Sequence, residues 1–330
     1  MTNNIKFCTY YDQWVDTYKA GQVRPVTLAK YYSIGRQLHE LVPNLKLSVM
    51  TRFDVQTLVN KYGKTHELST VREFLHHIKA PLQDAVYEGW LTKDPTYKVH
   101  PTSQFKRPTT RVKWLEMDQV KRLETAFNNS NSVAARMFDF DLRTSLRLAE
   151  LLGLTPGDID ENNLTVSVNK TWKYKDKHPD FGPTKNKFSV RIIKIDHFAL
   201  DDLERVIAMC KPKTTEPIFI KGFSKETKQN QHIYTRILHH QKYCRVFDAT
   251  LSDRLNAFCK EANVPRISIH SLRHTHASIL ITNHVSIQSV AKRLGHTNTE
   301  TTQSTYIHLL DDLAAQDDDK MLSVLSKLTS

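Results

Sequence analysis

The sequence predicts a mainly α-helical protein of two domains, with a small antiparallel sheet in the second domain. Three observations lead to this class. The chain of 330 residues is longer than one typical domain. Most apolar residues recur at helical spacing, whereas two segments between residues 163 and 195 alternate apolar and polar residues as strands do. A stretch of linker composition near residue 100 divides the chain.

The first domain, residues 1–100, carries four helical patterns. Gly63 is expected to end the third helix. Pro81 is expected to bend or interrupt the fourth, because proline lacks the amide hydrogen that a helix interior uses. The patterns span residues 10–20, 27–42, 51–63 and 69–90.

A basic linker is predicted at residues 101–112, within a wider stretch from 97 to 114 that contains proline, serine and threonine. Its charge indicates contact with an anionic partner, and a solvated linker is the alternative. The basic side chains predicted to make this contact are Lys106, Arg107, Arg111 and Lys113.

The second domain, residues 113–310, mixes helices with the two predicted strands, and an acidic tail follows at 311–330. The strand patterns cover residues 163–174 and 188–195, and a lysine-rich loop joins them. The helical patterns cover residues 118–127, 133–154, 200–210, 249–262, 271–283 and 286–295.

The chain is basic along most of its length, with a formal net charge of +12 and a pI of about 9.4. Residues 1–110 and 111–330 each carry a net charge of +6, and only the tail is acidic, at −3. This balance favours a polyanionic partner, either nucleic acid or an anionic membrane surface. A basic solvated surface is the alternative.

Other features argue against a membrane or secreted protein. No apolar run approaches the roughly 18 residues that span a bilayer, and the N-terminus has no apolar core like that of a signal peptide. The four cysteines are far apart in the sequence, which is typical of buried thiols in a reducing compartment. We therefore expect a cytoplasmic protein with free thiols at Cys8, Cys210, Cys244 and Cys259.

The motif HSLRHTH contains three histidines and an arginine. His270 and His274 have the spacing of two metal ligands on one helix face, but Ser271 stands where a zinc protease needs glutamate. His270 and Arg273 also share a face, so that both could contact one anion. We favour the anion, and we expect His274 and His276 to pack or cap locally.

Four motifs follow one another between residues 140 and 310: TSLRLAELLGL, HSLRH, LGHTN and STYIHL. With the lysine hairpin PTKNKFSVRIIKI, they make the second half resemble the catalytic domain of the tyrosine recombinases, or phage integrase family. Residues 1–100 resemble the helical, SAM-like core-binding domain of that family, most clearly at QDAVYEGWLTKDP. The resemblance implies an N-terminal domain that binds the core DNA site and a mixed α+β catalytic domain.

The resemblance implies that Tyr306 attacks the scissile phosphate and leaves a 3′-phosphotyrosine bond and a free 5′-hydroxyl. Only about 0.1% of a free phenol is ionised at neutral pH, so the nucleophile needs help. Arg147 and Arg273 would hold the non-bridging oxygens of the phosphate. His270 and His296 would contact the same phosphate or the nucleophile.

Lys185 matches the lysine proposed as general acid for the leaving 5′-oxygen, and Lys187 is its competitor and otherwise a DNA contact. Glu150 is expected to orient an arginine, although an ordinary surface pair between Glu150 and Arg147 is the alternative. Arg191 is expected to contact DNA or the backbone. Ser145 occupies a place where the family often has glycine.

These assignments predict a site-specific DNA recombinase, the integrase or excisionase of a phage or other mobile element, that works without a cofactor. Its partners would be double-stranded attachment sites, further copies of itself in a tetramer on synapsed DNA, and an accessory directionality protein. The two domains would form a C-shaped clamp around the duplex. The alternatives are a type IB topoisomerase and a non-catalytic DNA-binding regulator.

Two further expectations concern the ends of the chain. The tail could form an apolar stripe that docks on a neighbouring protomer, with packing on its own domain as the alternative. The first helical pattern begins within about ten residues of Met1. We therefore expect either a protein that works without an arm-binding domain or a truncated chain.

Overall fold

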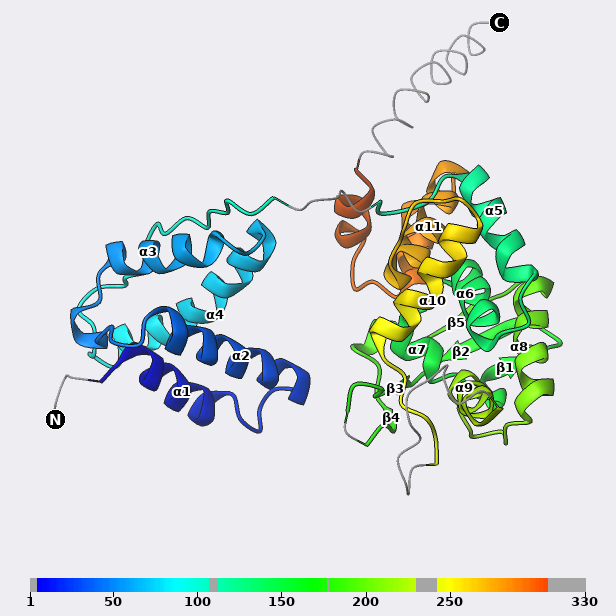
Figure 1. Cartoon of the computed structure of the whole chain (residues 1–330), viewed down its shortest axis with the longest axis horizontal. Coiled ribbons are helices and arrows are strands. Elements are labelled where there is room, and N and C mark those ends of the chain that lie inside the picture. Colours follow the sequence, from blue (N-terminus) through cyan, green and yellow to red (C-terminus); the bar gives the residue numbers. More distant parts are fainter. Residues whose placement is uncertain (1–4, 107–111, 177, 230–241, 308–330) are drawn as a thin grey trace, which may run out of the picture. The chain divides into compact units, whose positions relative to one another are not determined.

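The computed structural model describes residues 5–106, 112–176, 178–229 and 242–307. The chain divides into two compact units, Met1–Thr110 and Arg111–Ser330, and each is described by itself (Figure 1). Of the predicted linker contacts, Lys106 and Lys113 are exposed. Arg107, Arg111 and the tail at 311–330 lie outside the described residues.

The first unit is built from four helices around one apolar core, as the sequence predicts. Aromatic and aliphatic side chains such as Tyr11, Leu38 and Phe74 are almost fully buried. The third helix ends at Gly63, as predicted, and only glycine fits there, because an added Cβ would lie 2.0 Å from the Thr102 carbonyl oxygen. The helices are α1 (Phe7–Tyr18), α2 (Pro25–Leu41), α3 (Arg52–Gly63) and α4 (Leu68–Tyr87), with a short 3-10 turn at Leu47–Val49.

The predicted interruption at Pro81 is wrong, because α4 is one helix from Leu68 to Tyr87. An interior proline costs about 3 kcal/mol. Ile78 and Leu82 are fully buried on either side of it, and burying such side chains contributes about 1.5–3 kcal/mol each. Packing of this face therefore offsets the cost of the proline.

Among its described residues, the second unit combines the helices α5 to α12 and a further helical stretch at 300–307 with two small antiparallel sheets. The two predicted strands are confirmed in their middle parts: Thr165–Val168 within the first pattern pairs antiparallel with Arg191–Lys194 within the second, with Val166 opposite Ile193. The end of the first pattern, Thr171–Trp172, is a separate strand in another sheet. The three-stranded sheet has the order β1 (Ile159–Asp160), β2 (Thr165–Val168) and β5 (Arg191–Lys194), and the second sheet pairs β3 (Thr171–Trp172) with β4 (Phe181–Gly182). The helices are α5 (Met117–Asn128), α6 (Val133–Thr144), α7 (Leu148–Leu152), α8 (His197–Cys210), α9 (Ile218–Gln229), α10 (Asp248–Glu261), α11 (Ile269–Thr282) and α12 (Ile287–Leu294).

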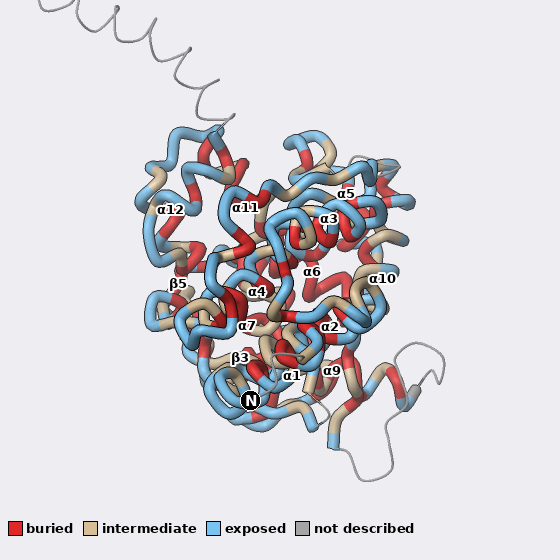
Figure 2. Tube along the Cα trace, turned by 90° about the vertical axis from the view of Figure 1, so that its left-hand side faces the viewer, coloured by how far each residue is buried: buried red, intermediate tan, exposed pale blue. Residues whose placement is uncertain are grey.

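Helix α6 is the centre of this unit. All of its residues except Arg143 are buried, and the tube is mostly red there in Figure 2. It packs against α5, α8, α9, α10 and α11, so the segments around its ends are held on several sides. Helix α9, which the sequence analysis did not predict, covers one side of it.

A buried polar cluster ties α6 to its neighbours. The Arg136 guanidinium donates to Asp202 Oδ1 at 2.8 Å, to Asn128 Oδ1 at 3.3 Å and to the backbone carbonyls of Phe127 and Ser130. Both side chains of the Arg136–Asp202 pair are at most 3% exposed. The pair therefore depends on its partners rather than on water.

Replacing Arg136 with leucine is expected to destabilise the protein by about 3–5 kcal/mol, because the Asp202 carboxyl and the carbonyls of Phe127 and Ser130 would stay buried without their donor. Urea denaturation followed by circular dichroism measures this change. Arg205→Leu is the control, since Arg205 pairs with Asp201 in solvent and such pairs contribute less than about 1 kcal/mol. Equal effects of the two substitutions would contradict the account.

None of the described helices is long and apolar enough to cross a membrane. All four cysteines are buried and free, as the sequence predicts. Burial raises the pKa of the Cys210, Cys244 and Cys259 thiols.

Candidate active site

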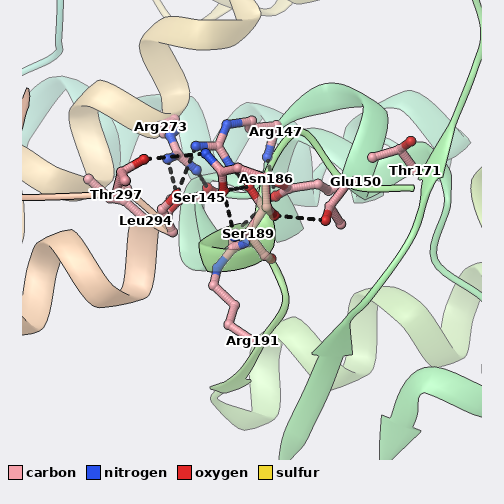
Figure 3. A network of polar contacts seen from close by, with 12 residues as sticks. Ser145, Arg147, Glu150, Thr171, Asn186, Ser189, Arg191, Arg273, Leu294 and Thr297 are labelled. Carbon is pink, nitrogen blue, oxygen red and sulfur yellow. Dashed lines mark hydrogen bonds and ion pairs between the residues drawn. The ribbon is translucent and has the colours of Figure 1, made fainter. Parts of the chain in front are cut away.

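Two left-handed residues bring distant parts of the chain together. Ser145 ends α6 with φ 56° and ψ 37°, and Gly295 ends α12 with φ 67°. Their carbonyl oxygens accept hydrogen bonds from two arginines: Arg273 donates to Ser145 at 2.6 Å (Figure 3), and Arg147 donates to Gly295 at 3.0 Å. Arg273 also donates to the carbonyl of Leu294. The left-handed ends of α6 and α12 therefore fix the orientation of both arginine side chains.

The left-handed backbone explains why the helical pattern at 133–154 divides into α6 and α7. It also makes Ser145 a strained position, because a left-handed conformation costs a residue with a Cβ about 1–2 kcal/mol. The Ser145 hydroxyl is buried and has no hydrogen-bond partner among the described residues. Both effects favour glycine at this position.

Ser145→Gly is therefore expected to stabilise the protein by about 1 kcal/mol, after allowance for the greater freedom of glycine in the unfolded chain. Ser145→Val is expected to destabilise it, since a β-branched side chain tolerates the left-handed region poorly. Thermal unfolding of the three proteins checks the order. A glycine variant less stable than the valine variant would contradict the described backbone.

Arg147 lies at the N-cap of α7, where Glu150 holds it. Its guanidinium donates to Glu150 Oε1 at 2.8 Å and to Ser189 Oγ at 3.1 Å. Glu150 is 1% exposed, so the pair is not the ordinary surface arrangement considered above. Burial acts to raise the pKa of Glu150, but Arg191 and Arg147 outweigh it and lower that pKa. The carboxylate is thus ionised and orients both arginines.

Of the two contacts predicted for Arg191, DNA or backbone, the structure shows the backbone contact. Its side chain is 6% exposed, and its three guanidinium nitrogens donate within the protein. They reach the Arg293 carbonyl at 2.7 Å, the Ser189 carbonyl at 2.9 Å and Glu150 Oε2 at 3.1 Å. Arg191 therefore supports the arrangement around Glu150 from inside the fold.

His270 and His296 lie close enough to both arginines for their charges to act on them. Burial, then Arg273 and Arg147, lower the pKa of His270. The same three causes lower the pKa of His296 to about 4. His296 Nδ1 also bonds Thr302 Oγ1 at 2.8 Å, which fixes its ring. Both imidazoles are therefore neutral at neutral pH while no anion is bound.

Tyr306 belongs to a helical stretch at 300–307, and its side chain is 1% exposed. The ring packs in a small apolar cluster formed by α11 and α12, and burial raises the pKa of its phenol. The hydroxyl is bonded to His274 Nδ1 at 2.8 Å. The expectation that His274 packs locally is wrong: it contacts a side chain 32 positions further on.

His276 packs within the fold, with Nδ1 bonded to the Leu142 carbonyl at 2.9 Å and Nε2 accepting from Arg293 at 2.9 Å. The i, i+4 spacing of His270 and His274, considered above only for metal binding, signals their contact: the two rings lie 4.6 Å apart, edge to face. No group of three or more His, Cys, Asp or Glu side chains in the described part of the chain could hold a metal ion.

Lys185 and Lys187 are exposed residues of the segment between β4 and β5. The segment is tied to the site through Asn186, which accepts from the Ser189 hydroxyl at 2.9 Å and lies 3.4 Å from Thr297 Oγ1. Ser189 in turn accepts from Arg147. The backbone at Lys185 is therefore held beside the arginines.

Two arginines, the neutral imidazoles of His270 and His296, the imidazole of His274 and a phenol lie within one unit, in a fold of helices with small sheets. Such a set suits covalent phosphoryl transfer, the chemistry expected of enzymes that cut DNA through a tyrosine. The model described as "Phage integrase family" matches residues 113–312, which is more than half of the chain. The chain therefore belongs to the phage integrase family, and it is a site-specific tyrosine recombinase of a phage or other mobile element.

Known proteins agree with this assignment. The chain is 25% identical over 299 residues to the integrase of Staphylococcus phage L54a, covering 84% of this chain and 81% of that one. It is 24% identical over 265 residues to the ICEBs1 integrase of Bacillus subtilis (strain 168), covering 78% and 66%.

Two solved structures share the fold. The Tn1549 transposon integrase, in complex with circular intermediate DNA, has a TM-score of 0.74 at 18% identity and covers 96% of this chain and 99% of that one. A lambda integrase dimer bound to a COC′ core site has a TM-score of 0.62 at 15% identity and covers 90% and 94%. The predicted family, fold class and enzyme class are confirmed.

Proposed function

We propose that Tyr306 is the nucleophile that cuts one DNA strand at an attachment site and stores the phosphodiester as a 3′-phosphotyrosine. Arg147 and Arg273 hold the phosphate, and His270 and His296 donate hydrogen bonds to it or to the nucleophile. Lys185 protonates the leaving 5′-oxygen. Because the phosphotyrosine conserves the energy of the bond, the strand can be rejoined without a nucleotide cofactor.

The observation that carries the proposal is an excess of positive charge around the two left-handed turns. Three guanidiniums, those of Arg147, Arg191 and Arg273, gather around one ionised carboxylate. Burial and Arg147 lower the pKa of Arg273 to about 9, so it stays charged at neutral pH. Burial raises the pKa of the nearby Asp141 well above its usual range, which removes a second negative charge. A phosphate would balance the site.

We further propose that both basic units bind double-stranded DNA, with residues 1–100 on the core site and the linker at 101–112 on the backbone. Relatives of the same fold were solved with DNA, including one as a dimer. Most of the affinity would come from phosphate contacts and would fall steeply with salt. Base contacts from helices would select the site.

Recombination also needs two duplexes, so we propose a tetramer on synapsed DNA and an accessory protein that sets direction. The tail at 311–330 would dock on a neighbouring protomer. An apolar strip supports this: Ile192 on β5, the edge strand of the three-stranded sheet, and Phe188 and Val190 just before that strand are each more than half exposed. A surface of this kind commonly marks a protein contact.

The test is a nicked suicide substrate that carries the attachment site, so that the cut end diffuses away and the adduct accumulates. We expect a covalent protein–DNA band on a denaturing gel, both with and without EDTA. Absence of the band while binding persists would favour the non-catalytic regulator. Relaxation of supercoiled plasmid that lacks the site, without exchange between two sites, would favour the topoisomerase.

A further inference from the structure

The Tyr306 hydroxyl is bonded inside the protein to an imidazole that the assigned roles leave unused. His274 Nδ1 lies 2.8 Å from Tyr306 Oη, and the two rings meet edge to face at 5.8 Å. His274 belongs to α11, the same helix that supplies His270 and Arg273. A phenol and an imidazole at this distance form the pair that proton transfer requires.

The environment keeps this imidazole ready to accept a proton. Burial, then His270, Arg273 and Lys113, lower the pKa of His274 to about 4. The ring is therefore neutral at neutral pH and has one nitrogen with a free lone pair. A bound phosphate would bring negative charge to the same region and raise the pKa of His274, which makes it a stronger base when substrate is present.

The other imidazoles are less well placed for this task. His296 Nδ1 is bonded to Thr302, and His270 meets the His274 ring edge to face. The phenol itself cannot supply the phenolate, because burial raises its pKa above the ordinary value. Attack on phosphorus at neutral pH thus needs a group that removes the proton.

We propose that His274 is a catalytic residue of strand cleavage that accepts the phenolic proton; this rests on the proposed function, in which Tyr306 is the nucleophile. The bond between Tyr306 Oη and phosphorus forms as the bond to the 5′-oxygen breaks. The phenolic proton moves to His274 Nδ1, and the 5′-oxygen receives a different proton, from Lys185. In rejoining, the 5′-hydroxyl gives its proton back to Lys185 and attacks phosphorus as the bond to Tyr306 Oη breaks, and His274 returns its proton to the phenolate.

The test compares two suicide substrates, one with oxygen and one with sulfur at the bridging 5′ position of the scissile phosphate. Sulfur leaves without protonation, so it restores variants that lack the general acid but not variants that lack the base. We measure the rate of adduct formation for His274→Ala and His274→Asn. Asparagine keeps a hydrogen-bond acceptor near the place of Nδ1 but cannot take up a proton.

Both His274 variants are expected to react roughly 10²–10⁴-fold more slowly than wild type on both substrates, the usual range for a general base. Lys185→Ala is expected to be slow on the oxygen substrate and restored on the sulfur substrate. His197→Ala, an exposed histidine of the same unit, is the matched control and should react at the wild-type rate. DNA binding and thermal unfolding verify that each variant is folded. If the alanine variant does not fold, the asparagine variant alone tests the proposal.

The pH profile separates a base from a group that only positions the phenol. The wild-type rate should level off above the pKa that His274 has in the DNA complex. The asparagine variant should keep accelerating at higher pH, because hydroxide must then remove the proton. An asparagine variant with the wild-type rate and profile would show that His274 only orients Tyr306.

Three results would overturn the inference. Both His274 variants could form the adduct at the wild-type rate, or the asparagine variant alone could show the wild-type rate and pH profile. The third is a return to the wild-type rate of either variant on the sulfur substrate. Failure of the proposed function would look different. In that case an adduct would form in Tyr306→Phe, whatever the His274 variants do.

Discussion

Phenylalanine at position 306 is expected to abolish the covalent adduct, with a loss of about 10⁶-fold, the size found when a covalent nucleophile is removed. The substitution deletes only the hydroxyl, and the ring stays in its apolar cluster. DNA binding should therefore remain at the wild-type level. Suicide-substrate gels measure the adduct, and mobility-shift titrations measure the binding.

Tyr243→Phe is the control for this experiment. It also removes a bonded phenolic hydroxyl from the second unit, where Tyr243 donates to Glu216 at 3.2 Å. Its adduct yield should equal that of wild type. Loss of the adduct in both variants would show that the Tyr306 result reflects damage to the fold, and an adduct in Tyr306→Phe would remove Tyr306 from the mechanism.

The second large effect is expected at Arg273. Arg273→Gln should slow adduct formation by about 10²–10³-fold, because a fixed donor to the transition state contributes about 2.7–4 kcal/mol. Arg273→Lys should recover little of this loss. Lysine keeps the charge, but its donors sit on one nitrogen and do not reproduce the planar fork in which two nitrogens of Arg273 reach the Ser145 and Leu294 carbonyls.

Arg205→Gln controls for the loss of one positive charge, since Arg205 is exposed on α8 and pairs only with its neighbour Asp201 in the contacts described. It should leave the rate unchanged. Single-turnover rates at saturating protein separate chemistry from binding. If Arg273→Gln and Arg205→Gln reacted equally fast, Arg273 would have no role in holding the phosphate.

Much of the fold follows from apolar periodicity alone. The helices of the first unit and the pairing of β2 with β5 were predicted because each buries one regular face. The break between α6 and α7 was not predicted, because a left-handed residue is usually signalled by glycine and the residue there is Ser145. Helix α9 was missed because its apolar residues all lie in its first half, where Ile218, Phe219 and Ile220 are consecutive, and because Gly222 disfavours a helix interior.

The candidate site divides in a similar way. The sequence motifs indicated the arginines, the histidines and Tyr306 because their order and separations are distinctive. The roles of Arg191 and His274 could be seen only in the structure. In a sequence, an arginine on a strand indicates a surface charge, and a second histidine on a helix indicates local packing. Only three-dimensional proximity relates Arg191 to Glu150 and His274 to Tyr306.

The most direct measurement is to digest the trapped protein–DNA complex with protease and locate the nucleotide by mass spectrometry. We expect the 3′-phosphate to be attached to the peptide containing Tyr306, through the phenolic oxygen. Attachment to any other residue, in a protein whose Tyr306 is intact, would contradict it.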